Sequence, residues 1–263
     1  MNPMDGALNP SQIHALRQTQ AMLAVDGLTL NKFGMDQVIR MLRNEITREE
    51  YQQLLREEYK PDEEEEEIEL PSDSGIPANK FDCHNGEELL NIATLSAAGN
   101  LAHLIYNPIE GNYDFQHLKD IHRFIFGDVF YSAGKPRDFD IDDSGKYSPA
   151  ASIETDAEEI FAGFLSSCED ANTNKFKFAE ALATQYIKMY SLSPFVTGND
   201  FARREFLRTL CLNFGYIFDF TETYYLELMQ TDELDFEEGD DRKLFDIFQK
   251  CIISPPTMAT SKL

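Results

Sequence analysis

The chain has 263 residues and a formal net charge of −24, with 47 acidic side chains against 23 lysines and arginines. This length is ample for a hydrophobic core, and the 42% of hydrophobic residues is typical of a folded protein. So strong an acidic field repels phosphate backbones and anionic membrane surfaces, and no basic run is longer than Arg203-Arg204. We therefore expect a protein that binds neither nucleic acid nor a membrane.

The N-terminus and the cysteines favour a cytoplasmic protein. Residues 1–6 lack the basic and apolar regions of a signal peptide. No run approaches the roughly 18 apolar residues that span a bilayer. The cysteines are far apart and form no CxxC pair, so we expect reduced and mostly buried thiols at Cys83, Cys168, Cys211 and Cys251.

Residues 11–58 are predicted to form a small helical domain. Apolar residues recur at helical spacing over 11–25 and 35–43. A third helix is predicted to begin at Thr47, because Thr47 and Glu50 form a capping-box pattern. Three short helices bury little apolar surface on their own, so we expect them to pack on the rest of the chain or on another chain.

An acidic segment over residues 59–80 follows this domain. It contains five consecutive glutamates, Glu63 to Glu67, and then prolines and a glycine that resist regular structure. We predict a solvated linker, with a docking segment for a basic partner as the alternative.

The larger unit, residues 81–253, is also predicted to be mostly helical, and a tail follows at 254–263. Turn residues over 139–147, flanked by Phe, Ile and Tyr, allow one small β-hairpin. The predicted fold class is therefore mostly α with a minor β element. Apolar spacing predicts helices over 87–105, 115–126, 156–168, 177–190, 200–214, 221–228 and 240–252.

One turn between two predicted helices carries most of the chemistry. Gly198 and Asn199 open the second helix, and such a turn directs several unpaired backbone N–H groups at one point, which forms an anion-binding site. The alternative is an ordinary helix N-terminus with Asn199 or Asp200 as the N-cap.

The segment around this turn resembles the signature of the Fic/Doc family, His-Pro-Phe-x-(Asp/Glu)-Gly-Asn-Gly-Arg-x-x-Arg. Residues 193–204 read Ser-Pro-Phe-Val-Thr-Gly-Asn-Asp-Phe-Ala-Arg-Arg. Residues 111–123 and 126–137 are similar to the family's upstream helix and the turn after it, and residues 204–216 to its following helix. The resemblance covers residues 85–230 and implies a Fic-type helical bundle with a small β-hairpin flap.

The resemblance also implies an activity, a set of ligands and a partner. Fic proteins typically transfer AMP from ATP, with Mg²⁺, to a hydroxyl of a target protein, and Ser193 stands at the position of their catalytic histidine. The flap, here Lys146, Tyr147 and Ser148, would bind the target protein as an added strand. The nucleotide-binding positions would be Thr197, Gly198, Asn199, Asp200 and Arg204.

The motif departs from the family pattern at four positions. The Ser193 hydroxyl does not accept a proton near neutral pH as imidazole does. Thr197 replaces the metal-binding carboxylate, and Asp200 places a negative side chain in the phosphate cradle. Phe201 replaces the first phosphate-binding arginine. These changes favour a pseudoenzyme with no metal site.

None of the five histidines lies in the motif. His117 and His122 belong to the upstream helix, where we expect structural roles. A different chemistry in the same cradle would need a new base near Ser193, and the sequence offers none.

The N-terminal helices resemble the antitoxin-type domain of some Fic proteins. Its inhibitory helix carries (Ser/Thr)-x-x-x-Glu-Gly, and the glutamate pairs with the last motif arginine to block ATP. Here residues 22–27 read Met-Leu-Ala-Val-Asp-Gly, so Asp26 would be the inhibitory residue and Arg204 its partner, within the chain or between chains.

Two functions follow. The first is a Fic protein, nominally a protein adenylyltransferase, whose degenerate motif impairs or abolishes transfer, with Mg²⁺ and ATP as ligands if it is active and no cofactor otherwise. The alternative is an inactive interaction module that binds a partner through the flap or the acidic linker.

Overall fold

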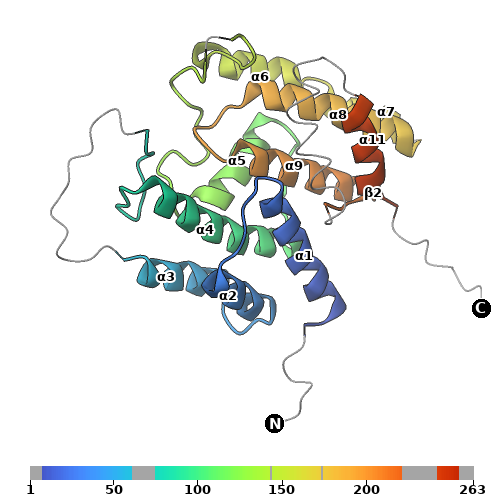
Figure 1. The fold of residues 1–263 in the computed structure, drawn as a ribbon. Coiled ribbons are helices and arrows are strands. Elements are labelled where there is room, and N and C mark those ends of the chain that lie inside the picture. The colour runs from blue at the N-terminus through green and yellow to red at the C-terminus, as the bar shows by residue number, and fades with distance from the viewer. Residues whose placement is uncertain (1–7, 61–74, 143, 173, 221–241, 255–263) are drawn as a thin grey trace, which may run out of the picture.

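The computed structural model describes residues 8–60, 75–142, 144–172, 174–220 and 242–254, and in these residues the fold is largely helical (Figure 1). A 3₁₀ turn, η1 (Ala150–Ser152), precedes α6, and β1 (Ile217–Phe218) pairs antiparallel with β2 (Ile252–Ile253). The mostly α fold class is confirmed. The helices are α1 (Pro10–Ala24), α2 (Lys32–Leu42), α3 (Arg48–Glu58), α4 (Gly86–Tyr106), α5 (Phe115–Phe126), α6 (Ile153–Phe161), α7 (Phe164–Ala171), α8 (Lys175–Leu192), α9 (Asn199–Asn213) and α11 (Arg242–Cys251).

Helix α4 lies at the centre of the fold. Helices α1, α2 and α3 pack against it from one side in Figure 1, and α5 packs against it from another. Helix α5 in turn packs against α9, and α8 lies between α9 and the outer helices α6, α7 and α11. The turn that joins α8 to α9, which holds the Fic-like motif, is therefore fixed by helices on both sides.

The composition of α4 corrects the expectation that no segment is long and apolar enough to span a bilayer. An 18-residue window of this helix has a mean hydropathy of 1.2, so by length and composition it could cross a membrane. However, 72% of that window is buried inside the fold. A central helix of a folded protein has this character because it contacts neighbours on every side.

The N-terminal helices pack on α4, as expected of a unit too small to be stable alone. The predicted capping box at α3 is present: the Glu50 N–H donates to Thr47 Oγ1, and the Thr47 N–H donates to Glu50 Oε2. The Tyr51 ring packs on Gly99 of α4, and its hydroxyl donates to the Leu95 carbonyl oxygen at 2.6 Å.

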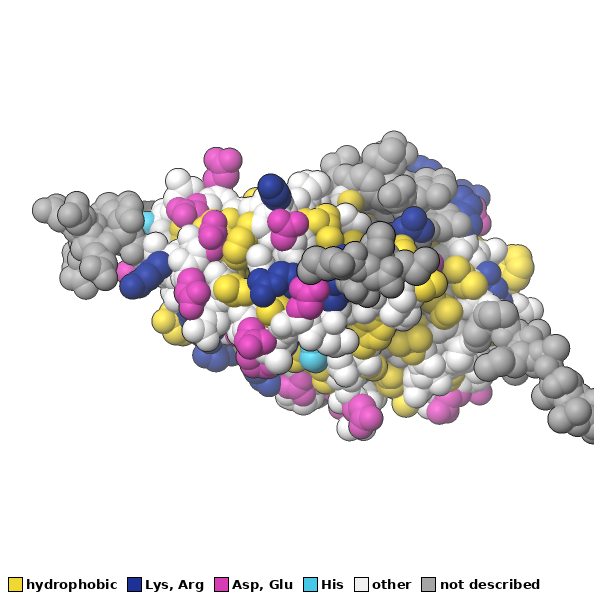
Figure 2. Space-filling view, turned by 90° about the horizontal axis from the view of Figure 1, so that it is seen from below, with side chains coloured by type: hydrophobic (Ala, Val, Ile, Leu, Met, Phe, Trp, Pro, Cys, Tyr) yellow, Lys and Arg dark blue, Asp and Glu magenta, His cyan; other side chains and the backbone are white. Residues whose placement is uncertain are grey.

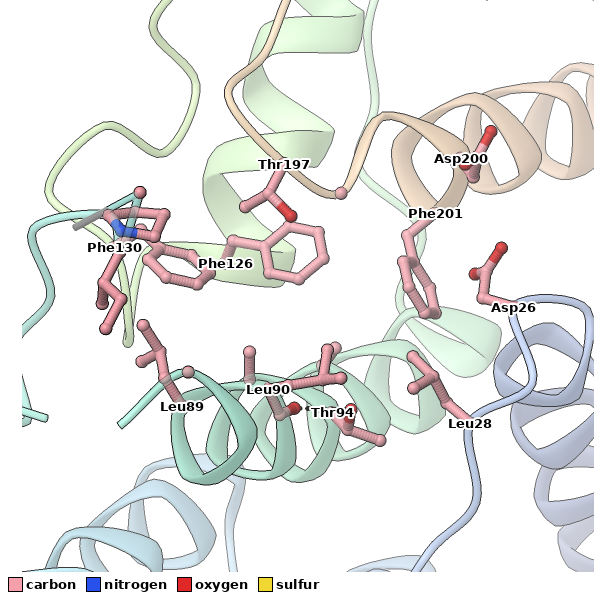
Figure 3. Close-up of a pocket in the computed structure, with 17 residues that line it drawn as sticks. Asp26, Leu28, Leu89, Leu90, Thr94, Phe126, Phe130, Thr197, Asp200 and Phe201 are labelled. Carbon is pink, nitrogen blue, oxygen red and sulfur yellow. Dashed lines mark hydrogen bonds between the residues drawn. The ribbon is translucent and has the colours of Figure 1, made fainter. Parts of the chain in front are cut away.

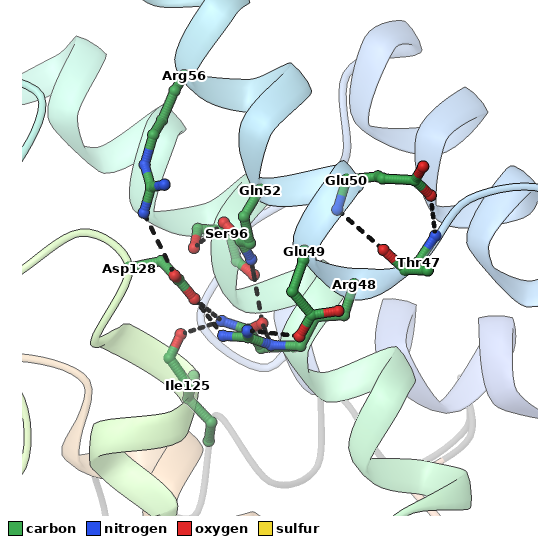
Figure 4. Close-up of polar contacts among 10 residues, drawn as sticks. Thr47, Arg48, Glu49, Glu50, Gln52, Arg56, Ser96, Ile125 and Asp128 are labelled. Atoms are coloured by element: carbon green, nitrogen blue, oxygen red, sulfur yellow. Dashed lines mark hydrogen bonds and ion pairs between the residues drawn. The ribbon is translucent and has the colours of Figure 1, made fainter.

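A polar cluster also ties α3 to the centre of the fold (Figure 4). Arg48 forms an ion pair with Asp128, in the turn after α5, and its Nε donates to Asn100 Oδ1 at 2.7 Å. Gln52 donates to the same Asn100 oxygen and accepts from the Ser96 hydroxyl. Because these partners are mostly buried, the cluster fixes one orientation of α3 on α4.

The predicted hairpin at 139–147 is wrong for the residues that the structure describes there, 139–142 and 144–147, which form turns and bends without paired strands. The physical reason is the Arg137 side chain. Its guanidinium donates to the carbonyl oxygens of Phe139 and Ser148, so these oxygens are bonded to a side chain instead of to a facing strand.

One helix prediction needs correction, and another is not tested by the described residues. The helix predicted over 156–168 is two helices, α6 and α7, because Gly163 between them has φ +69°. The predicted helix 221–228 lies outside the described residues, as do most of the predicted linker (61–74) and tail (255–263).

Charges of both signs are mixed on the surface. Figure 2 shows the face seen from below Figure 1, where acidic side chains alternate with basic and hydrophobic ones over the described part of the chain. The large net negative charge is therefore not gathered into one acidic patch on this face.

Gly99→Ala tests how α3 docks. An added Cβ would lie 2.4 Å from Tyr51 Cε1, so we expect the free energy of unfolding to fall by about 1–3 kcal/mol in urea titrations. Gly86→Ala is the control, because an added Cβ there meets no atom within 4 Å. Equal stability of the two variants would contradict this packing.

Candidate functional site

The α8–α9 turn has a backbone that only certain residues adopt. Ser193, at the C-terminus of α8, has φ +32°, and Gly198, at the N-terminus of α9, has φ +73°. A Cβ on residue 198 would lie 2.2 Å from the Phe126 ring. Glycine is therefore required at 198 both for its backbone and for the contact with α5.

Ser193 stands where the Fic pattern has its histidine, and its hydrogen bonds are those of a helix end. The side chain is buried, and its hydroxyl donates to the Tyr190 carbonyl oxygen one turn earlier. Its own carbonyl oxygen accepts from Arg137 Nε at 2.9 Å. These contacts hold the turn, and none of them is with a group that could accept the hydroxyl proton as a base.

Asn199 fixes the shape of the turn from inside. Its Oδ1 accepts from the Phe195 N–H, and its Nδ2 donates to the Phe195 carbonyl oxygen, each at 2.9 Å. The amide side chain thus satisfies both backbone groups of one residue. This explains the residue type structurally, without a ligand.

His122 of α5 supports the turn from outside. The Gly134 N–H donates to its Nδ1 at 2.8 Å, so the proton lies on Nε2, which donates to the Thr197 carbonyl oxygen at 2.8 Å. The ring stacks on Phe195 with centroids 3.8 Å apart. Burial lowers the pKa of His122 to about 4, so the ring is neutral near pH 7. His122 therefore holds the turn as a neutral ring.

Arg204 of α9 is completely buried and is bonded to the end of the N-terminal unit. Its guanidinium donates to both carboxylate oxygens of Asp26 and, at 3.2 Å, to the Met22 carbonyl oxygen. Burial raises the pKa of Asp26, and the Arg204 charge opposes this shift. The structure thus brings together the two residues that the antitoxin-like alignment pairs.

Arg203, which was not among the predicted site residues, has a similar arrangement. It forms an ion pair with Asp200, in the first turn of α9, and donates to the Tyr186 hydroxyl at 3.1 Å. Its guanidinium also lies over the rings of Tyr186 and Tyr190, 4.1 Å and 4.9 Å from their centroids. The i,i+3 spacing of Asp200 and Arg203 was the available signal in the sequence.

The predicted flap residues lie beside the C-terminal end of α8. The Ser148 N–H donates to the Ser191 carbonyl oxygen at 2.9 Å, and the Tyr147 and Tyr190 hydroxyl oxygens are 3.2 Å apart. The Lys146 ammonium lies over the Tyr190 ring, 5.2 Å from its centroid. Burial raises the pKa of Tyr147 to about 12.

A pocket of about 450 Å³ opens on the other side of the motif (Figure 3). Its floor is α4, and its other walls are the turn after α1, residues 75–77, the end of α5 with Phe130 after it, and the start of α9. Among the described residues that line it, none is a lysine, arginine or histidine. The lining combines apolar side chains with two carboxylates: Leu28, Ala93, Phe126, Phe130 and Phe201, and Asp26 and Asp200.

The described part of the chain holds no group of three or more His, Cys, Asp or Glu side chains placed to bind a metal ion. Thr197, at the position of the family's metal-binding carboxylate, faces the pocket in Figure 3 with a neutral side chain. The four cysteines are buried, and no disulfide joins any of them within the described residues.

The neutrality of His122 predicts a pH dependence of stability. The pKa of His122 is about 4 in the fold against an ordinary 6.5, so the unfolded chain binds the proton first. The free energy of unfolding therefore decreases as the pH is lowered from 6.5 towards 4. Between pH 7 and pH 5, the wild type should lose about 2 kcal/mol more than His122→Asn in urea titrations. His14→Asn, an exposed control, should follow the wild type; a parallel loss in His122→Asn would contradict a neutral buried ring.

Comparison with known proteins identifies relatives of this chain. It is 32% identical over 112 residues to the protein adenylyltransferase VbhT of Bartonella schoenbuchensis, which is 42% of this chain and 23% of VbhT. It is 32% identical over 101 residues to the probable protein adenylyltransferase Fic of Escherichia coli, 38% of this chain and 50% of that protein. The matches thus span half or less of these two relatives. No family model matches the chain.

Comparison with solved structures gives the fold. The BepC protein of Bartonella tribocorum, solved with bound AMPPNP, matches with a TM-score of 0.63 at 18% identity, over 71% of this chain and 96% of that one. This likeness agrees with the sequence relationship to Fic adenylyltransferases. In part of its sequence and in its fold, the chain is thus similar to Fic proteins.

Proposed function

We propose that this chain is a Fic protein in which AMP transfer from ATP to a target hydroxyl is impaired or absent. The observation that carries the proposal is the pairing of both arginines at the start of α9: Asp200 engages Arg203, and Asp26 engages Arg204. Neither guanidinium is presented to the pocket, and both are buried. A phosphate group entering the pocket would meet the two carboxylates first.

Magnesium and ATP do not fit the residues that are present. The described residues that line the pocket include no cation, and although no side chain caps the N-terminus of α9, Asp200 places a carboxylate in that same turn, where it repels phosphate. Thr197 offers Mg²⁺ a neutral oxygen, and a hard cation prefers charged oxygen ligands. We therefore assign this chain neither a magnesium nor an ATP site.

The group at the base position supports the same proposal. The Ser193 hydroxyl already donates to the Tyr190 carbonyl oxygen. Both ring nitrogens of His122 are hydrogen-bonded to backbone groups, of Gly134 and Thr197, and burial lowers its pKa. Losing a general base typically lowers a rate by ~10²–10⁴-fold. Neither Ser193 nor His122 is therefore placed to accept the proton of a target hydroxyl.

The N-terminal helices would act within the same chain. We propose that Asp26 has the place of the inhibitory carboxylate of antitoxin-type domains. Support comes from its ion pair with Arg204 and from the packing of α1 on α4. In this chain the pair would be permanent and structural.

A second candidate function is partner docking beside the predicted flap residues. Its support is a pair of hydrophobic side chains in the same loop, Phe139 and Ile141, which are 49% and 42% exposed. Two exposed apolar side chains in one loop suit contact with apolar side chains of a target protein. This function needs no nucleotide, so it is compatible with the first proposal.

Titration calorimetry of Mg-ATP into the full chain tests the proposal. We expect no binding at millimolar nucleotide to the wild type or to Asp26→Asn, because release of Arg204 does not supply the other missing groups. Asp120→Asn, which alters a second i,i+3 pair with Arg123 away from the pocket, is the control.

Binding to Asp26→Asn alone would mean that a working nucleotide pocket is closed by α1. Binding to the wild type would contradict the proposal outright. Folding of each variant is checked by its far-ultraviolet circular dichroism.

A further inference from the structure

The pocket beside the motif has a lining of one dominant character. Leu28, Phe126, Phe130 and Phe201 surround an open space above α4 in Figure 3, and Ala93 contributes a small side chain to its floor. A volume of about 450 Å³ is in the range of small-molecule sites. The body of any molecule that fills it must therefore be largely apolar.

The polar groups of the pocket lie mainly at one end. Figure 3 shows Asp26 and Asp200 together beyond Phe201. The Thr94 hydroxyl, on the floor, is already donated to the Leu90 carbonyl oxygen of its own helix. A ligand's polar group is therefore directed to the end that holds the two carboxylates.

The accessible charge at that end is negative although each carboxylate has an arginine. The side chains of Arg203 and Arg204 are 2% and 0% exposed. The side chains of their partners, Asp200 and Asp26, are 41% and 25% exposed. The cations lie behind the carboxylates as seen from solvent. Asp200 also raises the pKa of Asp26, a repulsion between like charges that a nearby cation would relieve.

We propose that this pocket binds a small molecule with an apolar, preferably aromatic, body and one protonated amine. The body would lie among Phe126, Phe130 and Phe201, and the ammonium group would donate hydrogen bonds to the carboxylates of Asp26 and Asp200, whose side chains are partly exposed. This rests on the proposed function, because it takes the pocket not to be a Mg-ATP site. It names the ligand class that replaces the nucleotide.

Three probes of equal body separate the contributions: 4-phenylbutylamine, 4-phenylbutanol and 4-phenylbutyrate, titrated calorimetrically into the full chain. We expect the amine to bind at least tenfold more tightly than the carboxylate, with the alcohol between them. An equal or tighter affinity for the carboxylate than for the amine would overturn the proposal. So would the absence of amine binding up to about 10 millimolar, a concentration at which even a weakly binding small molecule is detected.

Two variants locate the site. Asp200→Asn should weaken amine binding three- to tenfold and leave alcohol binding unchanged. Asp120→Asn, which alters a carboxylate of similar exposure in another i,i+3 pair, should change neither. Ala93→Phe should abolish binding of all three probes by filling the pocket, with folding checked by its unfolding curve. Unchanged amine affinity in both Asp200→Asn and Ala93→Phe would overturn the proposal.

The two proposals fail in distinguishable ways. Failure of amine binding without any Mg-ATP binding contradicts the amine site alone. Mg-ATP binding to the wild type, competed by the amine, contradicts both proposals, because the amine site takes the pocket not to bind nucleotide.

Discussion

A fully buried guanidinium needs a carboxylate, because an unpaired charge in a protein interior costs several kcal/mol. Arg204 is completely buried on α9, and Asp26, at the end of the N-terminal helices, supplies that carboxylate. The pair joins two segments far apart in the sequence. It also fixes the turn after α1, so that Leu28 becomes a wall of the pocket. The N-terminal helices are in this sense part of the Fic-like unit and not an appendage to it.

The same pairing decides the electrical character of the motif. In both pairs at the start of α9, the arginine is buried and the carboxylate is the more exposed partner. A helix N-terminus with open N–H groups ordinarily favours anions. Here the carboxylate of Asp200 already lies in the first turn of the helix, and Phe201 adds an apolar wall. The glycine turn at the start of a helix is thus present, while the charged side chains that it presents to the pocket are acidic.

Local patterns in the sequence were enough for much of the fold. Helix α5 has the predicted bounds, and the capping box at Thr47 is formed, because both depend on residues within one or two turns. The predicted hairpin does not form because the Arg137 side chain, just before it in the sequence, bonds the carbonyl oxygens of Phe139 and Ser148. Paired strands would have needed these oxygens. Gly163 divided a predicted helix because its left-handed backbone outweighed the apolar spacing around it.

The site was predictable only where a known motif aligned its residues. The contact between Asp26 and Arg204 follows from such an alignment, whereas the ion pair of Asp200 with Arg203 was missed although its spacing was visible. The pocket itself could not be predicted, since its walls come from five separate segments. Helical spacing shows that Leu89 and Phe126 are apolar positions of helices, but not that they face one another across a space.

The most direct test of this account is a double-mutant cycle on the pair, with Asp26→Leu, Arg204→Met and the double variant compared by urea unfolding. Each single change should lower the free energy of unfolding by about 3–5 kcal/mol, because it leaves one charge buried without its partner. The double variant should recover more than about 1 kcal/mol of the summed loss. Additive losses, or single changes that cost nothing, would contradict the dependence of the fold and of the pocket on this ion pair.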